Sequence, residues 1–401
     1  MKVAVIGGGA AGFFSAISAK HHNPEAQVTI YEKSDKLLSK VRISGGGRCN
    51  VTHHCFKINE LVKFYPRGEK PLKKAFGIFS PTDTIDWFKQ RGVELKTESD
   101  GRMFPTSDSS DTIIKCLMKE VNHLGIGIKT QSSIKSLRVS SEKIELGFKD
   151  NQFKEVDKVI IATGGSPRSE GFNWLRDLDH DIEEPVPSLF TFNMPDEDIK
   201  ELMGVVADPV SVKIMGTKLK SSGPLLITHW GMSGPAILKL SSFGARELSE
   251  MDYEFNVLIN WTGELSEQEI RDTLKNVVDS HGKKRIYNVN PFELPGRLWE
   301  FLIKKLDISD NMIWDNMGKK NINRLVHILM NDEYSVKGKT TFKEEFVTCG
   351  GVSLQDIDIK TMESRKVPNL YFAGEVLDID GVTGGFNFQA AWTTGFIAGR
   401  L

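Results

Sequence analysis

The stretch that decides the fold is Val3-Ala4-Val5-Ile6-Gly7-Gly8-Gly9-Ala10-Ala11-Gly12, near the start of the chain. Its first four residues are apolar, as in a buried strand of a parallel sheet. The glycines that follow match the pattern G-x-G-x-x-G, a tight turn whose backbone can approach a pyrophosphate before a helix begins. We therefore predict a helix from about residue 10 to 20, with its free N–H groups pointing at phosphates. The residues expected there are Gly7, Gly9, Ala10, Ala11 and Gly12.

A second apolar strand, Gln27–Tyr31, ends at an acidic residue. This residue, Glu32, lies twenty positions beyond Gly12, where an acid takes the ribose hydroxyls of an adenine dinucleotide. Lys33 follows it and is included among the expected cofactor contacts. An acid rather than a base argues against a 2′-phosphate, and the pattern leaves both FAD and NAD open.

Composition sets the broad class. The chain has 401 residues, enough for two or three domains, and is 39% hydrophobic and 26% charged. A formal net charge of −1 gives no overall field to recruit DNA, RNA or a membrane surface. No apolar stretch approaches the length of a membrane span, and no signal-peptide cleavage pattern follows the apolar start. Four cysteines without a C-x-x-C pair favour a reducing cytoplasm, and the oligomeric state is left open.

Three consecutive glycines, Gly45, Gly46 and Gly47, stand between two polar runs. Such a run sustains neither a helix nor a packed strand, so its backbone is expected against something flat or charged. Nearby basic side chains would offset pyrophosphate charge, and Asn50 would hydrogen-bond the edge of a flavin ring. A flexible surface loop is the alternative. The candidate contacts in this region are Lys40, Arg42, Ser44, Gly45, Gly46, Gly47, Arg48, Cys49 and Asn50.

The stretch Ser44–Thr52 resembles the S-G-G-G-R-C-N-x-T signature of the BaiN/RdsA-like NAD(P)/FAD-dependent oxidoreductases, a family of bacterial flavoproteins. Five further segments resemble the family's G-R-x-F-P, A-T-G-G, T-H-x-G-x-S-G-P, A-G-E-x-L-D-x-x-G and G-G-[YF]-N-x-Q motifs in the same order. They are Gly101–Pro105, Ala162–Gly165, Thr228–Pro235, Ala373–Gly381 and Gly384–Gln389. The resemblance covers essentially the whole chain.

The resemblance implies FAD rather than NAD at the first glycine turn, in a glutathione-reductase-like Rossmann domain interrupted by an insert. One departure follows Gly165, where typical members carry a longer glycine-rich segment than Ser166–Trp174. This difference bears on access of the substrate or nicotinamide, not on the flavin.

The remaining cofactor contacts are expected at three strand or helix ends. Ala162, Thr163 and Gly164 are small residues that let a dinucleotide pass close to the backbone. Gly374 and Glu375 stand where many FAD proteins have Gly-Asp, whose acid receives ribityl hydroxyls. A glycine-opened helix follows, and its N-terminus would stabilise negative charge on the reduced flavin. Its candidate contacts are Gly384, Gly385, Phe386, Asn387 and Gln389.

We expect the adenine contact just after a strand predicted at 126–130. In related flavin domains a residue there holds the adenine through its main chain, which makes Ile134 the candidate; an ordinary core residue is the alternative.

The predicted architecture is α/β, with a Rossmann-like FAD-binding domain built from 1–187 and 346–401. A β-rich insert of short strands, 188–262, suggests a small barrel or sandwich, and a helical subdomain, 263–345, follows it. The basic run at 282–285 is expected to be a solvated loop, with a pocket for NAD(P)H phosphates as the alternative.

His229, beside Trp230 and a glycine turn, is the candidate proton donor, and a structural contact is the alternative. No histidine or cysteine spacing indicates a metal site.

The leading hypothesis is a cytoplasmic reductase that passes hydride from NAD(P)H through FAD to an unsaturated small-molecule acceptor. The sequence contains no second G-x-G-x-x-G unit, so NAD(P)H would dock transiently as a co-substrate. The alternatives are a flavin oxidase, an RNA-modifying flavoprotein, and a non-catalytic redox sensor that uses Cys49.

Overall fold

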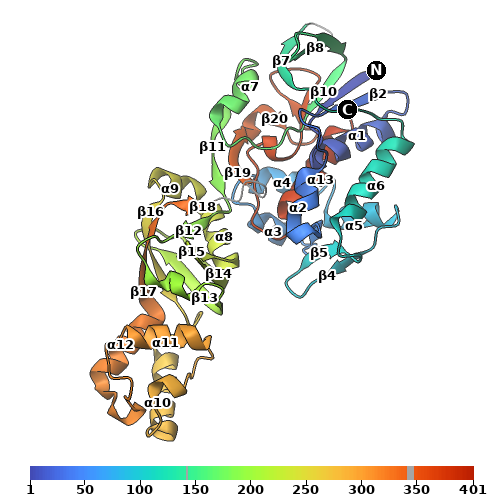
Figure 1. The fold of residues 1–401 in the computed structure, drawn as a ribbon. Helices are drawn as coiled ribbons and strands as arrows, with labels where there is room; N and C mark the ends of the chain where they lie inside the picture. The colour runs from blue at the N-terminus through green and yellow to red at the C-terminus, as the bar shows by residue number, and fades with distance from the viewer. Residues whose placement is uncertain (141–142, 341–346) are drawn as a thin grey trace. The chain divides into compact units, whose positions relative to one another are not determined.

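The computed structural model describes residues 1–140, 143–340 and 347–401. The chain divides into two compact units, Met1–Ser188 with Phe342–Leu401, and Leu189–Thr341. Each unit has its own buried apolar core, and both chain termini lie in the first unit (Figure 1). The boundary expected between residues 345 and 346 falls outside the described residues.

A seven-stranded sheet, ordered β20-β21-β22-β10-β1-β2-β6, forms the centre of the first unit. β1 lies between β10 and β2 and pairs in parallel with both, so that Val5 stands opposite Ile160 and Ile30. All three residues are buried, as expected for a strand covered on both faces. The strands are β1 (Lys2–Ile6), β2 (Gln27–Tyr31), β6 (Gly127–Lys129), β10 (Lys158–Ile161), β20 (Ile357–Asp358), β21 (Glu363–Ser364) and β22 (Leu370–Phe372).

Two helices from opposite ends of the chain, α1 (Ala10–His22) and α13 (Phe386–Ala398), pack side by side in this unit (Figure 1). Ser18 Oγ donates to the carbonyl of Phe396 at 2.7 Å. A Cβ on Gly395 would lie 2.8 Å from the Ala11 carbonyl, so glycine permits the close approach. The other helices are α2 (Ser39–Gly47), α3 (Ile58–Leu61), α4 (Glu69–Phe76), α5 (Pro81–Lys89), α6 (Ser110–His123) and α7 (Asn173–Arg176).

Three smaller antiparallel sheets complete the first unit. They are β3 (Thr52–His53) with β5 (Arg102–Pro105) and β4 (Leu95–Thr97); β7 (Ile134–Val139) with β8 (Ile144–Phe148) and β9 (Phe153–Val156); and β11 (Ile182–Ser188) with β19 (Val347–Val352).

The second unit contains another seven-stranded sheet, ordered β17-β16-β13-β14-β15-β12-β18. Its strands are β12 (Thr191–Asn193), β13 (Val206–Ile214), β14 (Lys220–Thr228), β15 (Gly231–Ser233), β16 (Glu254–Asn260), β17 (Asp332–Lys337) and β18 (Lys339–Thr340). Its helices are α8 (Pro235–Phe243), α9 (Ala245–Glu250), α10 (Glu267–His281), α11 (Gly296–Lys304) and α12 (Gly318–Asn331).

This sheet differs in two ways from the expected insert. Within the described residues its hydrogen-bonded order has two ends, β17 and β18, and does not close into a barrel. The range expected to be helical also contains these strands, because 332–337 alternates buried and more exposed side chains and pairs with β16. One core joins the strands and helices, so they form a single unit.

Among the described residues, no helix is both long enough and apolar enough to cross a membrane.

Candidate flavin site

The first glycine turn leaves open space in front of α1. A Cβ on Gly7 would lie 2.2 Å from the Ala162 carbonyl oxygen, and one on Gly12 would lie 1.9 Å from the Gly7 carbonyl oxygen. These two glycines are required for packing. A Cβ on Gly9 would meet no atom within 4 Å, and Gly9 provides no side-chain cap for α1. The first N–H groups of α1, from Ala10 onward, therefore face a space that can receive an anion.

Glu32 is hydrogen-bonded within the turn. Its Oε2 accepts from the Gly8 N–H at 2.8 Å, and its Oε1 accepts from the Ser34 N–H and hydroxyl, both at 2.9 Å. A carboxylate has about four acceptor positions, so three protein bonds leave capacity for a ribose hydroxyl. Lys33 beside it is exposed.

The segment expected at the adenine lies beside Glu32. The Ser132 N–H donates to the Glu32 carbonyl at 2.8 Å, and β7 begins two residues later at Ile134. Ile134 is half-buried, paired with Phe148 across β8. The chain therefore brings the adenine and ribose candidates to one edge of the sheet.

The residues that follow β10 and β22 lie close to α1, on the side of β1 away from β2. The Ala373 N–H donates to the Ile161 carbonyl at 2.9 Å, which places the residues after these strands next to each other. A Cβ on Gly374 would lie 2.7 Å from Cβ of Ala11. Thr163 is exposed, and a Cβ on Gly164 would meet no atom within 4 Å.

Glu375, which follows β22, is hydrogen-bonded to both α2 and β19. It accepts from Lys40 Nζ at 2.6 Å and from the Thr348 N–H at 2.9 Å. The Thr348 hydroxyl is buried and has no hydrogen-bond partner among the described residues, although a Cβ on Gly165 would lie only 2.6 Å from it. A buried hydroxyl without a partner is costly, and a polar ligand in this corner would satisfy it. Thr348 was not among the predicted contacts, because it lies far along the chain in a segment with no cofactor motif.

The glycine loop, Gly45–Gly47 at the C-terminal end of α2, has an unusual backbone. It departs from helical geometry, because Ser44 is extended and Gly45, Gly46 and Gly47 have φ of 59°, 68° and 85°. Gly46 and Gly47 are exposed, with no atom within 4 Å of a Cβ built on either. This backbone suits glycine and leaves room for a ligand to approach.

The two arginines of this region form ion pairs. Arg48 contacts Glu98 at 2.6 Å and stacks over the ring of Phe104 at 4.0 Å, and Arg42 contacts Asp111 at 2.8 Å. Their partners come from distant parts of the sequence. Both arginines therefore anchor the loop to neighbouring elements.

Cys49 is buried, with a φ of 62°. Burial raises the pKa of its thiol to about 12, and a hydrogen bond with Ser44 opposes the rise only weakly. Such a thiol stays protonated at neutral pH, which disfavours it as a redox sensor.

Amide side chains form hydrogen bonds with the backbone and side chains around the start of α13. The Asn50 amide, in its satisfied orientation, donates to the Thr52 carbonyl and accepts from the Gly385 N–H, both at 3.0 Å. Asn387 forms two 2.8 Å bonds with the backbone of Gly381. Gln389 is fully buried and accepts from Thr52 Oγ1 at 2.6 Å. These amides hold the backbone that surrounds the N-terminus of α13.

Phe386 is buried at the first turn of α13, where its ring stacks on Phe64 and on His53 at centroid distances of 4.4 and 4.5 Å. His53 Nδ1 also hydrogen-bonds the Gly384 carbonyl at 2.9 Å. This role of His53 was not predicted from the sequence, because histidine spacing was used only to look for metal sites. Its position directly after the Ser44–Thr52 signature was the signal that could have indicated it.

His229 belongs to the second unit. It is exposed on the turn between β14 and β15, with its ring 4.1 Å from that of Trp230. Among the described residues, no group of three or more histidine, cysteine or acidic side chains is arranged to hold a metal.

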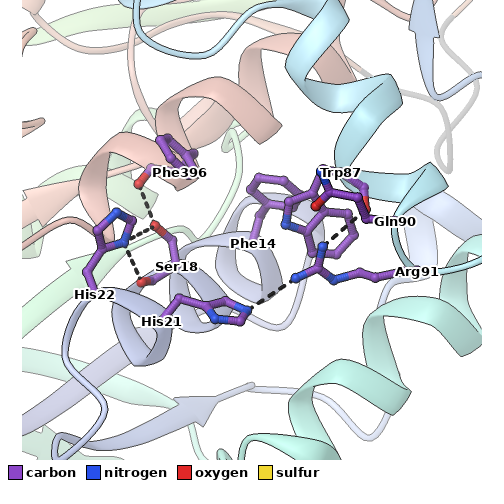
Figure 2. A pocket seen from close by; sticks show the side chains of 8 residues that line it. All are labelled: Phe14, Ser18, His21, His22, Trp87, Gln90, Arg91 and Phe396. Atoms are coloured by element: carbon purple, nitrogen blue, oxygen red, sulfur yellow. Dashed lines mark hydrogen bonds between the residues drawn. The ribbon is translucent and has the colours of Figure 1, made fainter.

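A separate hollow of about 280 Å³ is lined by four side chains of α1, from Phe14 to His22, together with residues of other elements (Figure 2). Arg91 stacks on Trp87 there and contacts Glu120 at 2.7 Å. It contains none of the predicted cofactor residues. Its lining residues are Phe14, Ser18, His21, His22, Trp87, Gln90, Arg91 and Phe396.

A sheet whose five central and edge strands β22-β10-β1-β2-β6 are parallel, a glycine turn that opens onto α1, an acid at the end of β2 and a glycine-opened C-terminal helix define an FAD-dependent oxidoreductase with a Rossmann-type FAD-binding domain. Sequence comparison agrees, because the family model described as "HI0933-like protein Rossmann domain" matches residues 1–401. The chain belongs to this family.

Two curated relatives match over nearly their full lengths. The 3-dehydro-bile acid delta(4,6)-reductase of Clostridium scindens is 26% identical, over 100% of this chain and 98% of its own. The ribosomal RNA dihydrouridine synthase of Escherichia coli is 28% identical, over 97% of this chain and 95% of its own. The solved structure of 3-ketosteroid delta1-dehydrogenase from Sterolibacterium denitrificans is similar in fold, with a TM-score of 0.53, 11% identity, and coverage of 99% and 98%.

The residues present fit FAD. Open backbone at Gly9 and Gly164 would admit the pyrophosphate, Glu32 would take the adenosine ribose, and the unsatisfied Thr348 hydroxyl would face a polar part of the cofactor. The glycine loop and the N-terminus of α13 would flank the ring.

Proposed function

We propose that this protein uses NAD(P)H to reduce a carbon–carbon double bond conjugated to a carbonyl group in a small-molecule acceptor. The observation that carries the proposal is the open space at Gly9 in front of α1, in a chain whose relatives, matched over nearly their full lengths, are named for such reductions. A Δ4,6 3-oxo steroid and a uracil ring both contain a double bond next to a carbonyl.

Bound FAD would supply two-electron hydride transfer between the nicotinamide and the acceptor. The β-carbon of the acceptor gains the hydride and the α-carbon gains a proton, so one double bond is lost and NAD(P)H becomes NAD(P)⁺. The N-terminus of α13, opened by Gly384 and Gly385, would stabilise negative charge that develops beside it. His229 is the proposed donor of the proton at the α-carbon.

An RNA uridine is the second candidate acceptor. The relative from Escherichia coli supports it by name, and exposed basic side chains occur in two stretches of the second unit, one after α10 and one on α12. These are Lys283, Lys284, Arg285, Lys319, Lys320 and Arg324. Basic clusters bind phosphates, although the net charge of −1 gives no general attraction for RNA.

The acceptor is tested with protein whose FAD has been reduced by dithionite under anaerobic conditions. A steroid with a 3-oxo-4-ene group should restore the absorbance of oxidised flavin within seconds and lose its double bond, as checked by mass spectrometry. Reoxidation by ribosomal RNA alone would favour the second candidate. Reoxidation by oxygen alone would contradict both.

His229→Gln should slow this reoxidation by about tenfold to a hundredfold, as expected for loss of a general acid. In a separate mixing experiment, it should leave the rate at which NAD(P)H reduces the flavin unchanged. Equal slowing of both steps would instead assign His229 a structural role, and Lys239→Gln, on α8 of the same unit, serves as the control.

A further inference from the structure

Two strands of the first unit carry the chain into and out of the second unit. The chain leaves through β11 and returns through β19, and the two strands pair antiparallel, with Ser188 opposite Val347. We call this pair the connector ribbon. Because its strands are hydrogen-bonded to each other, a displacement of one acts on the other.

The returning strand is bonded to the flavin side through Glu375. This carboxylate accepts from the Thr348 N–H of β19 at 2.9 Å and from Lys40 Nζ of α2 at 2.6 Å. Lys40 lies on the helix that leads into the glycine loop. One side chain thus links the ribbon to that loop.

The departing strand is bonded in the same manner through Asp380. Its carboxylate accepts from Ser188 Oγ at 2.7 Å and forms an ion pair with Arg67. Asp380 is fully buried; burial raises the pKa of its carboxyl and Arg67 opposes the rise. A buried ion pair gives little net stability because desolvation offsets attraction, so a positioning role is the better explanation.

The chain between Asp380 and α13 is held tightly. The Val382 N–H donates to the Phe64 carbonyl at 2.9 Å, and Gly381, Gly384 and Gly385 are held by Asn387, His53 and Asn50 as described above. A shift of Asp380 is therefore transmitted to the N-terminus of α13 rather than absorbed by a loose loop.

We propose that Glu375 and Asp380 are positioning residues that couple the connector ribbon to the two segments flanking the flavin. Each carboxylate holds one strand of the ribbon and one cation of the FAD-binding unit. Cofactor binding thereby orders the ribbon, and a displacement of the ribbon alters the flavin site. This inference rests on the proposed flavin site.

The test is hydrogen exchange of the full chain with and without saturating FAD. In the wild type, FAD should slow amide exchange in β11, β19 and residues 381–385 by about tenfold or more, because coupling between sites is reciprocal. In Ser188→Ala, FAD should bind with a Kd within about twofold of the wild-type value, while the slowing in β11 falls below about twofold. Ser280→Ala, an exposed serine of α10, is the matched control and should behave as wild type.

Asp380→Asn keeps the shape of the side chain and removes its charge, and should abolish the slowing in both β11 and 381–385. If this variant fails to fold, Ser188→Ala still decides the question. FAD-dependent slowing that persists in Ser188→Ala, or that is missing from a wild type with bound flavin, would overturn the coupling and leave the proposed function standing. Failure of the wild type to bind FAD, seen as missing flavin absorbance, would overturn both.

Discussion

At the scale of single residues, the glycines of the first turn serve two different purposes. Gly7 and Gly12 allow neighbouring backbones to approach, whereas Gly9 leaves open space for a ligand. The sequence pattern predicts all three positions, but only the structure separates the two packing glycines from the one that leaves open space.

Gly12→Ala should destabilise the fold, because the new Cβ would overlap the Gly7 carbonyl oxygen, 1.9 Å away. We expect a loss of about 3 kcal/mol or more in the free energy of unfolding, measured with urea on the cofactor-free protein. Gly9→Ala should unfold as wild type yet bind FAD at least about tenfold more weakly in a fluorescence titration, because its methyl group enters the phosphate space. Equal effects of the two substitutions on stability would contradict this assignment.

Cys49 should be unreactive in the folded protein. With a thiol pKa of about 12, roughly one molecule in 10,000 carries a thiolate at pH 8, and burial blocks the reagent as well. Iodoacetamide at pH 8 should modify the half-buried Cys55 and leave Cys49 unmodified until urea is added, as read by peptide mass spectrometry. Rapid modification of native Cys49 would revive the redox-sensor alternative.

At the scale of elements, local sequence patterns predict the bounds of strands and helices, but they do not predict which distant side chains form ion pairs. The strand Gln27–Tyr31 has the predicted bounds, and the helix expected to reach residue 20 runs to His22. Arg48 was expected to offset phosphate charge, yet it contacts Glu98, fifty positions away. Spacing along the chain indicates which side chains a motif presents, but not which distant acids compete for them.

Gln389 should matter for stability as well as for the site. Its Oε1 accepts from Thr52 and Thr84 at 2.6 and 3.0 Å, so Gln389→Ala removes the partner of the buried Thr52 hydroxyl and opens a cavity, while Thr84 keeps its bond to the Ser80 carbonyl. We expect a loss of about 2–4 kcal/mol in the free energy of unfolding, followed by circular dichroism in urea. Gln90→Ala, at an exposed position after α5 in the same unit, should change it by less than about 0.5 kcal/mol. Similar losses in both variants would argue against the buried network.

At the scale of the whole molecule, the two units have separate cores, one built from both ends of the chain and one from its middle. The FAD motifs at 3–12 and 384–389 predict a discontinuous domain, since both must reach one cofactor. The sheet of the second unit could not be predicted closely, because β18 and β12 are short and pair across more than a hundred residues.

Calorimetry should therefore resolve two unfolding transitions, because each core can melt as a cooperative unit. FAD at about 100 times its Kd should stabilise only the FAD-binding unit, by about 2.7 kcal/mol, and leave the other transition in place. A single transition that shifts as a whole would show that the units unfold together.

Reduction of the flavin by NAD(P)H is tested most directly by anaerobic mixing of the FAD-loaded protein with NADH or NADPH, followed by the absorbance of the oxidised flavin. We expect bleaching by at least one of the two nucleotides, with one NAD(P)⁺ formed per flavin. Gly9→Ala, reconstituted to the same flavin content, tests whether bleaching depends on the bound cofactor alone and should bleach at a similar rate per flavin. A flavin that stays oxidised with both nucleotides would contradict the proposed NAD(P)H-dependent reductase.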